Sequence, residues 1–194
     1  ILINHPHFKI NYIATTEGGV RATDLHPSLV GVFEQEVHKA EACEVAKHAK
    51  LAFLALPHKA AMGFAKELLD LHVKVVDLSA DYRLELEAYE KHYCEHEDKE
   101  HLGEAVYGLP ELNRAKIKEA RLIANPGCYP TASILGVLPF LDYLNKEAPI
   151  FISCSPLFSD LFHLFLRKIC YWLKNTFRIM LMAIYLHSHH NSNR

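Results

Sequence analysis

Short apolar runs alternate with stretches of helical periodicity along most of the chain. Residues 51–56 are continuously apolar, as expected for a strand that is buried on both faces. Residues 59–71 carry apolar side chains at the three- and four-residue spacing of a helix, and residues 73–78 form another apolar run. The pattern therefore predicts a strand–helix–strand unit with two parallel strands.

The same alternation extends to both sides of this unit. We predict strands over residues 8–14, 122–124 and 150–152, a turn over 15–19, and helices over 85–93, 113–120 and 128–138. Strands that alternate with helices predict the α/β class, here an incomplete doubly wound parallel sheet. Because ligands bind beyond the carboxyl ends of such strands, Pro57, residues 79–83 and Cys128 become candidate site positions.

Composition narrows the classes of function. The chain has 194 residues, half of them hydrophobic, and its net charge of -2 predicts no affinity for nucleic acid. The five cysteines are widely spaced and form no Cys-x-x-Cys pair, which indicates a reducing, cytoplasmic compartment. His92, Cys94, His96 and His101 fit no common zinc spacing. We interpret their segment as a solvated helix and loop, and we expect no metal site.

The composition changes after about Ser153. Residues 154–194 contain five basic residues, a single acidic residue and no glycine, together with many large apolar side chains. One interpretation is a basic amphipathic helix on a membrane surface, although the longest uncharged stretch is short for a membrane span. We favour the alternative that this tail is helical or disordered and was translated in a displaced reading frame.

The clearest chemical signal lies in residues 122–132. Cys128 stands between a predicted strand and a predicted helix, where Pro126 and Gly127 permit a sharp turn. A thiol at a helix start lies in the field of unsatisfied backbone N–H groups, which favours the nucleophilic thiolate. A buried structural cysteine is the alternative for an isolated position, but the Asn-Pro-Gly-Cys-Tyr-Pro-Thr context favours a nucleophile.

Four motifs carry a resemblance to a known family. They are Leu-Ala-Leu-Pro-His at residues 54–58, Val-Asp-Leu-Ser-Ala-Asp-Tyr-Arg-Leu at 76–84, Ala-Val-Tyr-Gly-Leu-Pro-Glu-Leu-Asn at 105–113, and Asn-Pro-Gly-Cys-Tyr-Pro-Thr at 125–131. In order and spacing they resemble the N-acetyl-γ-glutamyl-phosphate reductases of arginine biosynthesis. The resemblance implies a Rossmann-like NADP-binding domain over residues 1–127, the nucleophile helix and start of a catalytic domain over 128–153, and an unrelated tail over 154–194.

The resemblance also implies a reaction and its residues. NADPH would reduce N-acetyl-γ-glutamyl phosphate to the semialdehyde, with loss of phosphate, through a thioester on Cys128. The amides around Gly127 to Tyr129, with the Asn125 side chain, would stabilise the oxyanion. The expected NADP contacts are Thr15, Thr16, Leu56, Pro57 and Ser79. The two threonines are equally compatible with an ordinary turn, and we interpret Asp81 and Arg83 as a structural ion pair.

Two further expectations concern the whole protein. Because the family's glycine-rich loop and catalytic histidine are not found in this sequence, we expect a fragment with negligible reductase activity. The complete enzyme is expected to be a homo-oligomer that acts on a small-molecule acyl phosphate. The alternatives are an enzyme like aspartate-semialdehyde dehydrogenase, whose cysteine typically follows an asparagine directly, and a non-catalytic truncated module with a membrane-surface tail.

Overall fold

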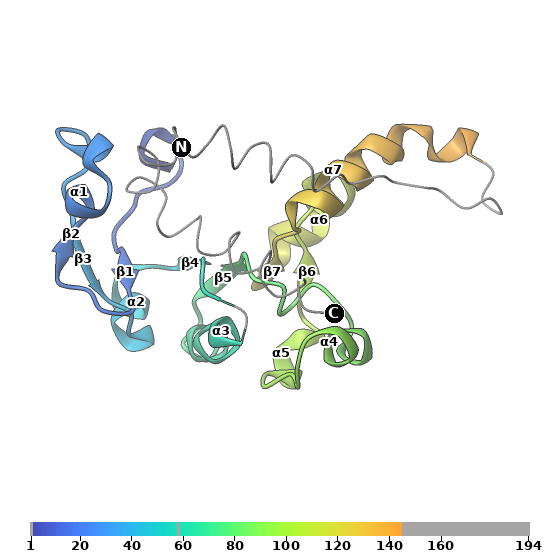
Figure 1. Ribbon diagram of the computed structural model, residues 1–194, viewed down its shortest axis with the longest axis horizontal. Coiled ribbons are helices and arrows are strands. Elements are labelled where there is room, and N and C mark those ends of the chain that lie inside the picture. Colours follow the sequence, from blue (N-terminus) through green and yellow to red (C-terminus); the bar gives the residue numbers. More distant parts are fainter. Residues whose placement is uncertain (1, 58, 145–194) are drawn as a thin grey trace, which may run out of the picture.

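The structure is a computed structural model that describes residues 2–57 and 59–144 (Figure 1). The strands are β1 (Ala14–Thr15), β2 (Val20–Arg21), β3 (Glu36–Lys39), β4 (Leu51–Leu54), β5 (Lys74–Asp77), β6 (Val106–Tyr107) and β7 (Leu122–Ala124). They form a three-stranded sheet of order β1-β3-β2 and a four-stranded sheet of order β4-β5-β7-β6. Every pairing in the four-stranded sheet is parallel, so the α/β prediction is confirmed.

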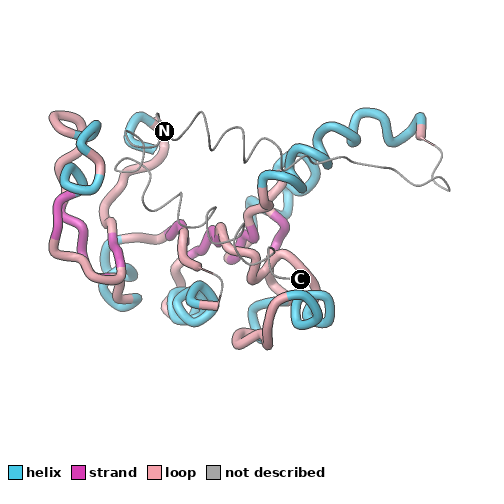
Figure 2. The backbone as a smooth tube through the Cα atoms, viewed as in Figure 1, coloured by secondary structure: helices cyan, strands magenta, loops and turns pink. Residues whose placement is uncertain are grey.

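Helices connect the strands, as the tube in Figure 2 shows. They are η1 (Leu2–Asn4), α1 (Ala22–Leu25), η2 (Pro27–Leu29), α2 (Ala42–His48), α3 (Ala60–Asp70), α4 (Leu86–His92), α5 (Lys99–Leu102), α6 (Pro110–Glu119), α7 (Cys128–Val137) and η3 (Leu138–Tyr143). In Figure 1, α3, α4 and α5 lie below the four-stranded sheet, whereas α6 and α7 lie above it. The expected strand at residues 150–152 and the tail at 154–194 fall outside the described residues.

The β4–α3–β5 unit forms the centre of the core. β4 and β5 pair from Leu51 opposite Lys74 to Leu54 opposite Asp77. α3 packs against β5, and four of the six apolar positions that the periodicity identified are fully buried, namely Ala61, Ala65, Leu68 and Leu69, whereas Phe64 is half-buried and Ala60 is exposed. Burying each leucine side chain contributes about 1.5–3 kcal/mol, so this helix anchors the sheet.

Two predictions about strands are wrong in part. Of residues 8–14 only Ala14 lies in a strand, because among the described residues β1 pairs with β3 alone, from Ala14 opposite His38. The run at 51–56 is a strand only from Leu51 to Leu54, and Phe53 is 48% exposed rather than buried. The side chain of Phe53 meets Phe8 edge to face, with ring centroids 6.4 Å apart, so a loop residue gives this sheet face part of its cover.

Two elements gave no signal in the sequence. β3 has the sequence Glu-Val-His-Lys and buries only Val37, so the strand shows no apolar run. α2 is seven residues long and buries only Ala42 and Val45. Both elements are held by long-range contacts, since β3 pairs with β1 and β2, and α2 contacts α3.

One helix begins earlier than predicted. α6 starts at Pro110, a residue favoured in the first turn, whereas the apolar pattern indicated a start at 113. Asn113 has non-helical backbone angles inside α6, and its side-chain amide donates to the Tyr107 carbonyl at 3.0 Å. This bond ties the helix to the end of β6 and kinks its first turn.

The turn between β1 and β2 yields a matched pair of substitutions. Gly18 and Gly19 both have positive φ, 68° and 73°, but a Cβ on Gly18 would lie 2.3 Å from the Lys39 nitrogen, whereas a Cβ on Gly19 meets nothing within 4 Å. Gly19→Ala should cost about 1 kcal/mol of unfolding free energy from backbone strain alone. Gly18→Ala should cost at least about 2 kcal/mol, because overpacking adds to that strain. Urea unfolding of both variants measures the difference, and equal losses would contradict the close approach of Gly18 to β3.

Candidate active site

The loops that follow the parallel strands are joined by main-chain hydrogen bonds. The Leu78 amide donates to Leu54 at 3.0 Å, and the Asn125 amide donates to Asp77 at 2.8 Å. The Gly108 amide donates to Ala124 at 2.8 Å. The carboxyl ends of β4, β5, β7 and β6 therefore form one edge, which is where an α/β sheet binds its ligands.

Cys128 lies at this edge as the first residue of α7. Gly127 is the N-cap residue, and its carbonyl accepts from the Thr131 amide at 3.0 Å and the Thr131 hydroxyl at 2.8 Å. Pro126 is buried and Cys128 is exposed. Because first-turn amides have no partner inside a helix, the N–H groups of Cys128 and Tyr129 point out of the start of α7 beside the thiol.

Arg83 holds the turn that carries Cys128. Its Nε donates to the Asn125 carbonyl at 2.7 Å, and its Nη2 donates to the Leu78 carbonyl at 2.7 Å. A Cβ on Gly127 would lie 3.2 Å from Nη1, so the guanidinium rests directly against the turn. The side chain thus joins the loops after β5 and β7 and places a fixed positive charge next to the start of α7.

The expected pair of Asp81 and Arg83 has different partners in the structure. Arg83 donates to the two carbonyls just described, whereas Asp81 accepts from the Lys59 amide at 2.9 Å and from the Tyr89 hydroxyl at 2.8 Å. The two side chains stabilise different loops. The role of Arg83 at the Cys128 turn was missed, since it depends on where the loops after β5 and β7 meet.

Asp77 and Ser79 form a buried polar turn at the end of β5. The carboxylate of Asp77 accepts from the Ser79 amide at 3.1 Å and from the Ser79 hydroxyl at 2.6 Å. The same hydroxyl accepts from the Asp81 amide at 3.1 Å. Burial raises the pKa of Asp77 to about 6, although the hydrogen bonds from Ser79 oppose the shift. The Ser79 hydroxyl is therefore occupied by hydrogen bonds inside the protein, and Ser79 contributes to the shape of this edge as a buried residue.

The predicted cofactor residues occupy two places. Leu56, which is half-buried, and Pro57, which is exposed, follow β4 at the shared edge. Thr15 lies in β1, where its hydroxyl accepts from the Gly18 amide at 3.0 Å, and Thr16 is exposed beside it. Thr15 thus stabilises the turn and keeps its O–H proton available to donate. Asn125 is the first residue of the loop after β7, and its side-chain amide donates to the Pro126 carbonyl at 3.1 Å.

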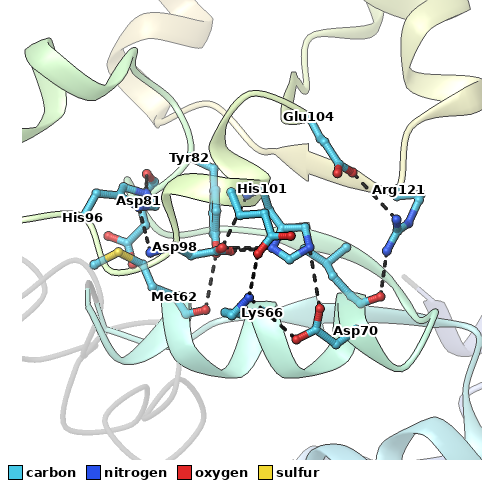
Figure 3. A network of polar contacts seen from close by, with 12 residues as sticks. Met62, Lys66, Asp70, Asp81, Tyr82, His96, Asp98, His101, Glu104 and Arg121 are labelled. Carbon is cyan, nitrogen blue, oxygen red and sulfur yellow. Dashed lines mark hydrogen bonds and ion pairs between the residues drawn. The ribbon is translucent and has the colours of Figure 1, made fainter.

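His96 and His101 are buried, whereas His92 is exposed, so the interpretation of this segment as a solvated helix and loop is wrong in part (Figure 3). The Nδ1 atom of His96 accepts from the Asp98 amide at 3.1 Å, which leaves the proton on Nε2 to donate to the Asp81 carbonyl at 2.8 Å. The carboxylate of Asp98 meets the Tyr82 hydroxyl at 2.8 Å and Nδ1 of His101 at 2.9 Å. In residues 2–57 and 59–144, no group of three or more His, Cys, Asp or Glu residues could hold a metal.

Comparisons with known proteins identify the family of this chain. Residues 1–120 match the family described as semialdehyde dehydrogenase, NAD binding domain. Proteins named N-acetyl-gamma-glutamyl-phosphate reductase are 60% identical in Sulfurovum sp. and 59% identical in Wolinella succinogenes, each over 155 residues. The protein of that name from Geobacter sulfurreducens is 45% identical over 157 residues. The resemblance seen in the four motifs is confirmed, and these names favour it over the aspartate-semialdehyde alternative.

The coverage of these matches is uneven. Each covers 80% of this chain but only 45% or 46% of the relative. The chain therefore spans about half the length of the curated relatives it matches. Among the described residues, no helix combines the length and the apolar character that crossing a membrane requires.

The raised pKa of Asp77 makes stability depend on pH. Its pKa is about 6 in the folded chain against 3.8 for the ordinary group. At a pH between these two pKa values, folding therefore takes up a proton. The free energy of unfolding falls as the pH rises through this range, until Asp77 is ionised in the folded state as well. Asp77→Asn removes this charge and keeps the shape. The variant should gain about 2 kcal/mol relative to the wild type between pH 4.5 and pH 8, by the rule of about 1.4 kcal/mol per pKa unit. Urea unfolding at both values tests this, and parallel pH profiles would contradict it.

Proposed function

The chain belongs to the semialdehyde dehydrogenase family through its NAD-binding domain, and we propose that it carries the cofactor-binding part and the nucleophile of an N-acetyl-γ-glutamyl-phosphate reductase. The single observation that carries the proposal is the position of Cys128. It is an exposed thiol at the first position of a helix, on the ligand-binding edge of a parallel sheet. The names of the relatives supply the substrate of the proposal.

The reaction begins with a covalent step at Cys128. The thiolate attacks the acyl carbon, a carbon–sulfur bond forms, and the bond from that carbon to the phosphate oxygen breaks, so phosphate leaves with the electron pair. The nicotinamide supplies, when bound, the hydride that reduces the resulting thioester. Cys128 then leaves as the thiolate when the carbon–sulfur bond breaks, and the aldehyde is released.

The start of α7 supplies the groups that stabilise this chemistry. The amides of Cys128 and Tyr129 can donate to the oxyanion that develops on the acyl carbon. The Asn125 side chain is held close by, because Arg83 fixes the Asn125 carbonyl at 2.7 Å. Arg83 also gives the turn a positive charge on the path of a negatively charged acyl phosphate. These roles extend the sequence-based assignment of Asn125, Gly127 and Tyr129.

The residues at the other strand ends fit a nicotinamide dinucleotide. Leu56 and Pro57 offer an apolar border after β4, in keeping with the family's NAD-binding domain. Thr15 ends β1 and Thr16 follows it, both with hydroxyls that can donate to a 2′-phosphate, and this favours NADP. A Cβ on Gly19 would meet nothing within 4 Å, so the turn beside these threonines is open.

The same proposal bears on the cellular compartment and the assembly state of the protein. Cys43, Cys94 and Cys128 are free thiols in the described part of the chain, which suits the reducing cytoplasm and keeps the nucleophile available. The homo-oligomeric state of the complete enzyme stays a prediction.

The covalent step can be tested without the cofactor. The full chain should acquire one acyl group on incubation with N-acetyl-γ-glutamyl phosphate, and should release an equal amount of phosphate, because thioester formation precedes reduction. Intact-mass and peptide mass spectrometry should place the acyl group on Cys128.

Two variants control this experiment. Cys128→Ser should abolish the adduct, and Cys43→Ser should keep it, since Cys43 is also exposed but lies on α2. Acylation of Cys43, or equal acylation of the Cys128→Ser variant, would reject Cys128 as the nucleophile.

The preference for NADP gives a second prediction. Thr16→Asp places a negative charge where the 2′-phosphate is expected, so it should raise the Kd for NADPH at least about tenfold through charge repulsion. The Kd for NADH should stay within about twofold, which makes NADH the internal control. Nicotinamide fluorescence titration measures both values, and unchanged binding of NADPH would remove Thr16 from the cofactor site.

A further inference from the structure

Asp81 is a buried carboxylate that the covalent chemistry does not use. It is 0% exposed, and its Oδ2 accepts the main-chain N–H of Lys59 at 2.9 Å. Its Oδ1 accepts the Tyr89 hydroxyl at 2.8 Å. The carboxylate thus connects the loop after β5 with the loop after β4, which lies some twenty residues earlier in the chain.

Lys59 is the residue that this contact controls. It is the N-cap residue of α3 and has a φ of 72°, a left-handed conformation that costs a residue with a Cβ about 1–2 kcal/mol. Its own side chain makes no capping hydrogen bond. Asp81 supplies an acceptor for the main-chain N–H of Lys59 from another loop, and a carboxylate beside the start of a helix is favoured by the helix dipole.

Tyr89 and His96 hold Asp81 in place. Tyr89 is fully buried, and burial, followed by its hydrogen bond to Asp81, raises the pKa of the Tyr89 hydroxyl well above its ordinary range. Nε2 of His96 donates to the Asp81 carbonyl, and the His96 ring lies edge to face with Tyr89, with centroids 5.0 Å apart. Figure 3 shows Asp81 at one end of this polar network, whose far end lies on α3. The carboxylate therefore has a single position.

We propose that Asp81 is a positioning residue for the dinucleotide, which acts through the Lys59 amide and fixes the place of Pro57 without touching the cofactor. The inference rests on the proposed function, which puts Pro57 against the cofactor. A consequence is that a negative charge lies beside the N-terminus of α3, which disfavours binding of the cofactor's phosphates there.

The test compares three variants of the full chain. Asp81→Ala removes the acceptor and should raise the Kd for NADPH at least about tenfold. Asp81→Asn should stay within about threefold of the wild type, because its amide oxygen can still accept the Lys59 N–H while the Tyr89 hydroxyl turns to accept from the amide nitrogen. Tyr82→Phe removes an equally buried hydrogen bond, to Asp98 at 2.8 Å, and should leave the Kd within about twofold.

A second readout separates positioning from stability. The rate at which iodoacetamide alkylates Cys128 should stay within about twofold in all three variants, since α7 is held by Arg83 and not by Asp81. A loss of NADPH binding in Tyr82→Phe equal to that in Asp81→Ala would overturn the inference, as would wild-type affinity in Asp81→Ala. Failure of the wild type to bind NADPH would instead reject the proposed function, and the inference with it.

Hydrogen exchange covers the case in which Asp81→Ala does not fold. In the wild type, NADPH should slow exchange of the Lys59 amide at least about threefold, because bound cofactor stabilises the start of α3. An unchanged rate, with NADPH shown to be bound by fluorescence, would overturn the positioning role.

Discussion

The hydrogen bond from the Asn125 amide to the Asp77 carbonyl, 2.8 Å long, is the contact on which the site depends. It continues the β5–β7 pairing, which ends with Asp77 opposite Ala124, one residue into the loop that leads to Cys128. Arg83 then bonds to the carbonyl of the same Asn125. The Cys128 turn is therefore fixed to the sheet by a main-chain hydrogen bond and by the Arg83 side chain, which meet at the same residue.

This arrangement requires buried polar groups, and each of them is paired. Within the described residues, no buried side-chain nitrogen or oxygen lacks a hydrogen-bond partner. Asp77 bonds to Ser79, Ser79 bonds to the Asp81 amide, and Asp81 bonds to Lys59 and Tyr89. Leaving one such group unpaired would cost about 1–3 kcal/mol. This series of hydrogen bonds from β5 to α3 therefore limits which residues are tolerated at these positions, as well as how the loops are placed.

The local patterns of the sequence predicted the parts of the fold that local patterns determine. β7 has the predicted bounds, and α7 begins at Cys128 because glycine and proline mark the turn. β3 could not be predicted, since Val37 is its only buried residue and its strand state comes from pairing with β1 and β2. The partners of Arg83 and the burial of His96 were likewise out of reach, because both depend on loops that meet only in the folded chain. The assignments of Thr15, Thr16 and Pro57 to the cofactor stay predictions.

Two helices that begin at the same edge of the sheet differ in what meets their N-termini. α3 follows β4, and the Asp81 carboxylate accepts the amide of its N-cap residue, Lys59. α7 follows β7 and begins with a thiol beside two amides that have no partner inside the helix. An anion that develops at this edge is therefore better stabilised at α7 than at α3, because α3 already carries a negative charge. The same buried carboxylate that stabilises the loop after β4 thus makes the two helix N-termini electrostatically unequal.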